Sequence, residues 1–117
     1  MTNATIANLE KLLGGPRDGA LLRYSLGNEW LKAGKPTLAS DFFRAAVERQ
    51  PSYSAAWKLL GKALVDSGET LAALAAYQQG IIAAKTSGDI QAAKEMAVFV
   101  KRLRRQADAG AKQTPSA

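Results

Sequence analysis

Apolar residues recur along most of the chain at the spacing of one face of an α-helix, and Gly and Pro interrupt the pattern. The first stripe follows Thr2 and Asn3, two residue types that cap helices, and it stops at Gly14-Gly15-Pro16. The stripe consists of Ile6, Leu9, Leu12 and Leu13. A helix of this length is marginal in water by itself. We therefore expect residues 1–16 to form a short helix that caps the elements after it.

The next two stripes predict a pair of helices. The first begins just after Asp18, which is placed to cap it, and its stripe is Leu22, Leu26, Trp30 and Ala33. Gly34 suits a left-handed helix end, and Pro36 suits the first turn of the next helix. That helix runs from Thr37 to Gln50 and stops at Pro51. Its stripe is Leu38, Ala39, Phe42, Phe43, Ala46 and Val47.

The same pattern returns further along the chain, at a spacing of 34 residues. The matching pairs are Leu26 and Leu60, Gly27 and Gly61, Trp30 and Leu64, Gly34 and Gly68, Ala39 and Ala73, and Phe43 and Tyr77. With Trp57, the second copy has the form W-x2-L-G-x2-(large apolar), followed by A-x3-(aromatic). This pattern resembles the tetratricopeptide repeat, a helix-turn-helix unit of 34 residues. Each copy departs from the pattern of the repeat. The first copy has Arg23 where the second has Trp57, and the second has Lys85 where the first has Pro51.

The resemblance implies an all-α fold, a right-handed superhelix of antiparallel helix pairs with about six helices. It divides the chain into repeats at 20–53 and 54–87, within a helical domain that spans 17–108. We expect Gly27 and Gly61 to let two helices approach closely, while the large apolar residues fill the space beside them. The last helix of the second repeat should run to about Lys85, where Thr86-Ser87-Gly88 breaks it.

A final amphipathic stretch predicts a helix over residues 89–107, capped by Ser87 or Asp89. Continuing the repeat places Glu95 where Gly is expected, so we interpret this helix as a C-terminal cap. Its packing stripe is Ile90, Ala93, Ala97 and Val100, and a second stripe of Met96, Phe99 and Leu103 is left over. This second stripe would be a groove wall or a homodimer surface. Residues 109–117 have the composition of a disordered tail.

Composition excludes several function classes. The chain contains neither Cys nor His, which excludes disulfides, thiol chemistry, the commonest general base and the usual zinc ligands. We therefore expect no enzyme, no metal and no cofactor. No run of about eighteen apolar residues is present, so we expect no membrane insertion and a cytoplasmic location. The net charge is +6, and its excess lies within residues 85–117, where seven Lys/Arg stand against three Asp/Glu.

The resemblance also implies a concave groove, lined by the first helix of each repeat, that holds a peptide or helix of a partner protein. Its candidate residues are Tyr24, Asn28 and Lys32 in the first repeat and Lys58, Lys62 and Asp66 in the second. Lys58 and Lys62 lie one helical turn apart, so their charges repel unless an anion lies between them. A carboxylate of an acidic partner would satisfy both. The alternative is that they are ordinary solvated lysines.

A second candidate surface is the basic run Lys101, Arg102, Arg104 and Arg105, which is placed to contact several phosphates of RNA or another polyanion. Basic residues in the last turns of a helix also interact favourably with its dipole, which by itself explains them. The chain lacks clear examples of the exposed aromatic residues usual in nucleic-acid readers, so we do not expect nucleic acid as the main partner. The leading hypothesis is an adaptor, monomeric or weakly dimeric, that binds an unidentified segment of another protein, with an acidic segment as the candidate.

Overall fold

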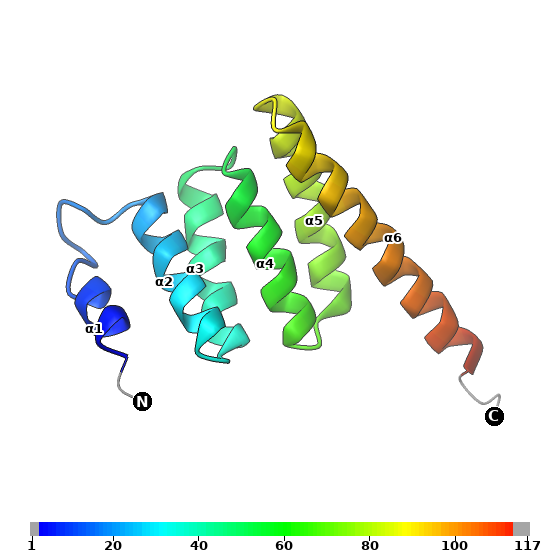
Figure 1. Ribbon diagram of the computed structural model, residues 1–117, viewed down its shortest axis with the longest axis horizontal. Helices are drawn as coiled ribbons and strands as arrows, with labels where there is room; N and C mark the ends of the chain where they lie inside the picture. Colours follow the sequence, from blue (N-terminus) through cyan, green and yellow to red (C-terminus); the bar gives the residue numbers. More distant parts are fainter. Residues whose placement is uncertain (1–2, 114–117) are drawn as a thin grey trace.

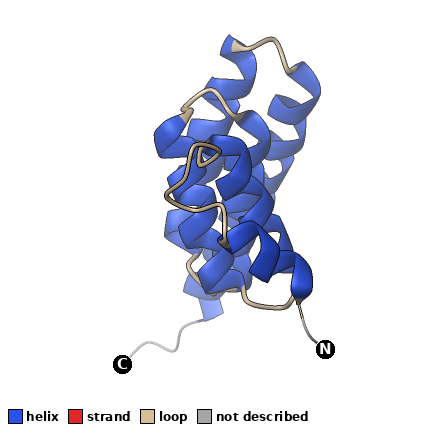
Figure 2. Ribbon diagram, turned by 90° about the vertical axis from the view of Figure 1, so that its left-hand side faces the viewer, coloured by secondary structure: helices blue, strands red, loops and turns tan. Residues whose placement is uncertain are grey.

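The computed structural model describes residues 3–113, with side chains described as far as residue 110. Six α-helices follow one another in this part of the chain (Figure 1). They are α1 (Ala4–Glu10), α2 (Ala20–Lys32), α3 (Pro36–Arg49), α4 (Ser54–Asp66), α5 (Thr70–Thr86) and α6 (Ile90–Gln113). The described residues include no strand, as Figure 2 shows. The predicted all-α fold of about six helices is confirmed.

The helices stack side by side in the order of the sequence. Helix α2 packs on α3, α4 packs on α5, and the two pairs meet where α3 contacts α4. Helix α6 covers α5 at one end, and α1 lies on α2 at the other (Figure 1). Because α4 also contacts both α2 and α6, these three helices form one layer, and α3 and α5 form the other. The layer of α2, α4 and α6 is therefore the surface on which a groove is expected.

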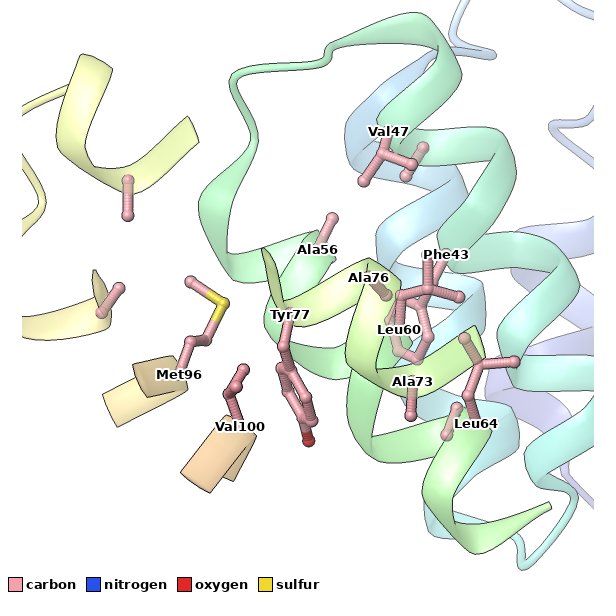
Figure 3. Close-up of a cluster of buried hydrophobic side chains, with 14 of the residues drawn as sticks. Phe43, Val47, Ala56, Leu60, Leu64, Ala73, Ala76, Tyr77, Met96 and Val100 are labelled. Atoms are coloured by element: carbon pink, nitrogen blue, oxygen red, sulfur yellow. The ribbon is translucent and has the colours of Figure 1, made fainter. Parts of the chain in front are cut away.

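Two glycines allow the helices of each pair to come close together. A Cβ atom added at Gly27 would lie 2.7 Å from Cδ1 of the Phe43 ring, and a Cβ added at Gly61 would overlap the ring of Tyr77. Phe43 and Tyr77 are both buried in the main apolar cluster (Figure 3). The predicted role of the two glycines is confirmed. Because Gly61 has no side chain, the ring of Tyr77 on α5 can pack directly against α4.

Most predicted helix ends agree with the structure to within a residue or two. Gly34 follows α2 with a φ of +76°, and Pro36 is the first residue of α3. Asn3 caps α1, because its Oδ1 accepts a hydrogen bond from the N–H of Ile6 at 3.2 Å. The other capping candidate, Thr2, lies outside the described residues. Ile6 is buried together with residues of α2, as expected for a short helix that depends on its neighbour.

The prediction that Asp18 caps α2 is wrong. The residue before α2 is Gly19, and no side chain caps the helix there. The Asp18 carboxylate instead accepts one hydrogen bond from the N–H of Gly14, at 2.9 Å, and two from Arg23, at 2.9 Å from Nε and 2.7 Å from Nη2. Asp18 therefore joins the linker between α1 and α2 to the first turn of α2.

This contact explains why the first repeat has Arg23 where the second has Trp57. The Trp57 indole N–H donates to the carbonyl of Pro51 at 2.8 Å, so it too ties a helix to the loop that precedes it. Arg23 likewise ties α2 to the residues before it, through the ion pair of its guanidinium group with the Asp18 carboxylate. The two repeats thus use different chemistry for one structural purpose.

Helix α6 is longer than the sequence indicated. Its cap is Asp89, whose Oδ1 accepts from the N–H of Ala92 at 3.1 Å. The predicted end was Ala107, with a tail over 109–117, whereas the helix continues to Gln113. A single glycine costs a helix only about 1 kcal/mol, and the other residues between 107 and 113 include several good helix formers. Residues 114–117 lie outside the described part of the chain.

The apolar face of α6 is wider than predicted, and this corrects the proposed homodimer surface. Met96 and Leu103 were assigned to a leftover stripe, but they are 0% and 6% exposed and belong to the core (Figure 3 shows Met96). Gly80 leaves room for Met96, since a Cβ there would lie 2.5 Å from its Sδ. Phe99 alone remains half-buried. Two of the three side chains of the proposed homodimer surface therefore pack within the molecule, and weak dimerisation itself stays a prediction from the sequence.

Candidate functional site

A cleft of about 290 Å³ lies between α4 and α6, on the layer where the groove is expected. Helix α5 closes its base with one side chain, that of Tyr77. The residues that line it are Lys58, Leu59, Lys62, Val65 and Asp66 from α4, Tyr77 from α5, and Phe99, Arg102, Leu103 and Gln106 from α6. Three of the six predicted groove residues, Lys58, Lys62 and Asp66, are therefore brought together on one wall of a real cleft.

The base of the cleft is apolar and firmly packed. Tyr77 is 4% exposed, and its ring lies 5.3 Å from the ring of Phe99, centroid to centroid, with the two planes inclined at 43°. Leu103 is buried beside them. Burial raises the pKa of Tyr77 to about 12, and the Asp66 carboxylate adds to this effect. Its hydroxyl therefore stays protonated and neutral at ordinary pH.

The rim of the cleft carries charge of both signs, and this changes the interpretation of the two lysines. Lys58 Nζ lies 3.0 Å from Oε1 of Glu95 on α6, and Lys62 Nζ lies 3.5 Å from Oδ2 of Asp66. Each ammonium group thus has a carboxylate of its own chain beside it. The expectation that the lysines require an external anion is not met, because Glu95 and Asp66 already relieve their repulsion.

Arg102 is a residue of this cleft that was assigned from sequence to a different surface. It lines the cleft from α6, and its guanidinium carbon lies 6.0 Å from the centroid of the Phe99 ring. Phe99, Arg102, Leu103 and Gln106 follow one another at the spacing of a single helix face. This spacing was readable in the sequence, but nothing there placed that face opposite α4.

The other predicted groove residues do not line the cleft. Tyr24 packs between aromatic residues, with its ring 4.9 Å from that of Tyr53 and 5.8 Å from that of Phe43. Lys32 lies 3.2 Å from the carboxylate of Glu29 on the same helix. Asn28 is half-buried on α2. These residues belong to the same layer as the cleft, one helix further toward the N-terminus.

The other members of the predicted basic run, Lys101, Arg104 and Arg105, are exposed on α6. They do not line the cleft, so the structure separates Arg102 from the rest of the basic run. Within the part of the chain that the structure describes, no helix combines the length and the apolar character of a membrane span. The described acidic residues also form no group of three that would suit a metal ion.

The chain is similar in sequence and in fold to known proteins. No family model matches it. It is 47% identical over 100 residues to the TPR repeat-containing protein PA0015 of Pseudomonas aeruginosa. The matched residues cover 86% of this chain and 95% of that protein. The solution structure of protein BPP2914 from Bordetella parapertussis matches with a TM-score of 0.80 and 35% identity, over 98% of this chain and 100% of that one. The Sgt2 TPR domain from Aspergillus fumigatus matches with a TM-score of 0.76 and 26% identity, over 96% and 73% of the two chains.

Proposed function

Because the chain belongs to the tetratricopeptide repeat family, we propose that it is a non-enzymatic interaction module that holds a peptide or helix of a partner protein between α4 and α6. The observation that carries this proposal is the cleft itself, an opening of about 290 Å³ with an apolar base and a charged rim. Binding sites of this kind combine apolar contact area with a few polar groups that fix orientation. The absence of His and Cys from the sequence supports a function without catalysis.

The contact residues in this proposal are Lys58, Lys62 and Asp66, which line the cleft. A longer partner segment would continue along the same layer toward α2 and reach Asn28, Lys32 and the half-buried Tyr24. We propose no cofactor and no metal. The partner is a protein or peptide, and the cytoplasmic location stays a prediction from the sequence.

The proposal is tested by affinity purification of the tagged protein from its native cell extract, beside the double variant Lys58→Glu and Lys62→Glu. Its matched control is Lys94→Glu with Lys101→Glu, which makes the same charge change on exposed residues of α6 outside the cleft. A partner that survives nuclease treatment, remains with the control and disappears with the cleft variant supports the proposal. A partner that binds all three proteins equally refutes the proposed location.

A second function, binding of RNA or another polyanion, is favoured by one observation. Lys101, Arg104 and Arg105 are exposed, and no ion pair joins any of them to a carboxylate in the described part of the chain. Polyanion binding weakens steeply with salt, because each phosphate contact releases counterions. An affinity for single-stranded RNA that changes little between low and physiological salt would exclude this function.

A further inference from the structure

The cations around the cleft differ in whether they already have a partner. Lys58 and Lys62 each lie beside a carboxylate of the same chain, at 3.0 Å and 3.5 Å. Arg102 is exposed, and in the described part of the chain no carboxylate is paired with it. An incoming anion therefore meets Arg102 with no internal competitor, whereas it must displace an internal carboxylate to reach either lysine.

Arg102 also stands directly beside the apolar base of the cleft. Its guanidinium lies 6.0 Å from the Phe99 ring, and that ring is in contact with Tyr77. The space of about 290 Å³ corresponds to roughly ten water molecules, which is enough for one large apolar side chain. The lining residues carry three positive charges and one negative charge, and Glu95 adds a second negative charge beside Lys58. The remaining net positive charge favours an anionic ligand.

Glu95 occupies a special position in the repeat pattern. It stands where Gly61 stands in the second repeat, but in the described structure α6 is the last helix, so no following helix needs a close approach there. A long side chain is accommodated as a result, and it reaches across to Lys58 on α4. Lys58 and Glu95 remain 33% and 41% exposed, so their ion pair is weak enough to exchange with another carboxylate.

We propose that the cleft selects a partner segment in which a large apolar side chain is followed by a carboxylate, that Arg102 binds this carboxylate, and that Glu95 competes with the ligand for Lys58. This inference rests on the proposed function, because it describes the ligand and the regulation of the same site. The apolar side chain lies in the cleft against the base formed by Tyr77, Phe99 and Leu103. Glu95 thus lowers the affinity of the free protein for acidic ligands and raises its selectivity for those that also offer an apolar group.

The test uses three capped peptides as probes: acetyl-Phe-Asp-Asp-amide, its Phe-Asn-Asn analogue without charge, and its Ala-Asp-Asp analogue without the ring. Binding is followed through the amide resonances of the full chain by two-dimensional NMR, which detects millimolar affinities. The wild-type protein should bind the first peptide most tightly, with the largest shifts at Phe99, Arg102 and Leu103. Equal binding of all three peptides would overturn the proposal.

Two variants, each with a matched control, separate the roles of the two charged residues. Arg102→Gln should weaken the Phe-Asp-Asp peptide about tenfold. Its control, Lys85→Gln, removes an exposed positive charge of α5 outside the cleft and should leave the affinity unchanged. Glu95→Gln should strengthen binding about two- to fivefold. Its control, Glu48→Gln at an exposed position of α3, should leave the affinity unchanged.

The outcomes distinguish this inference from the proposed function. If the peptides cause no shifts up to millimolar concentration while a partner is captured through the cleft lysines, the inference is wrong and the proposed function stands. If the peptides bind as described but no partner depends on the cleft, the proposed function fails. If Glu95→Gln leaves the affinity unchanged or weakens it, the Lys58–Glu95 pair is only a brace between α4 and α6. Circular dichroism of every variant confirms that the helices are intact.

Discussion

Replacing Gly61 with Ala tests the close packing that positions the base of the cleft. The added methyl group would overlap the ring of Tyr77, whose Cδ1 atom would lie 2.6 Å away. Phe99 holds that ring on another side, at a centroid distance of 5.3 Å, and Tyr77 is only 4% exposed. The ring therefore cannot turn aside without displacing its neighbours, because protein cores are close-packed.

Two opposing effects set the size of the change. Overpacking a core costs about 1–3 kcal/mol, whereas Gly to Ala inside a helix gains up to about 1 kcal/mol through its higher helix propensity. The overlap involves three atoms of a rigid ring, so the first effect should exceed the second. We expect the free energy of unfolding to fall by about 1–2 kcal/mol. The melting temperature should fall by about 4–8 °C.

The measurement is thermal and urea unfolding, followed by circular dichroism, for the wild type, Gly61→Ala, Tyr77→Leu and the double variant. Leu at position 77 lacks the two ring atoms, Cε1 and Cζ, that the new methyl group would meet. The cost of Gly61→Ala should therefore shrink toward zero in that background. A Gly61→Ala protein at least as stable as the wild type, or an equal cost in both backgrounds, would refute the reasoning.

Three further predictions concern stability. The pKa of Tyr77 is about 12 in the folded protein, above its ordinary value of 10.0, so the folded state holds the phenol proton more tightly than the unfolded state. The stability of the fold should therefore fall as pH rises from 10 to 12. Urea midpoints that stayed constant across this range would contradict this prediction. Asp18 has its pKa held below the ordinary value of 3.8 by Arg23 and by the N–H of Gly14. Its contribution is therefore present above pH 4 and lost as the solution becomes more acid, and Asp18→Asn should flatten the acid side of the stability profile. Gly68 has a φ of +80°, so Gly68→Ala should cost about 1–2 kcal/mol in urea unfolding, and a neutral result would argue against a left-handed turn there.

Part of the candidate site could be predicted from the sequence, because repeat proteins place equivalent residues on equivalent faces. Lys58, Lys62 and Asp66 were assigned to the groove wall, and they line the cleft. Tyr24 was assigned to the same wall, yet it stacks against Tyr53 instead. The repeat pattern defines the helix face, but whether a large side chain on that face stays free depends on which residue the next loop places beside it.

The opposite wall of the cleft could not be predicted. Arg102 was grouped with its neighbours Lys101 and Arg104 as one basic run, although only Arg102 lines the cleft. Glu95 was noted as a departure from the repeat, but its contact with Lys58 joins residues of two separate helices. Both facts depend on how α6 lies across α4 and α5, which is a long-range property.

The sequence by itself determined the helices, their order and the close approaches at Gly27 and Gly61, because helical periodicity, helix-ending residues and a repeated pattern are local signals. Only the tertiary structure decided that Met96 and Leu103 are core, that the cleft lysines are already paired, and that Arg102 lies beside an apolar base with no carboxylate among residues 3–110 paired to it. The physical reason is that a side chain's partners are set by the angle and offset at which helices pack. Those depend on the summed fit of many side chains from segments distant in the sequence.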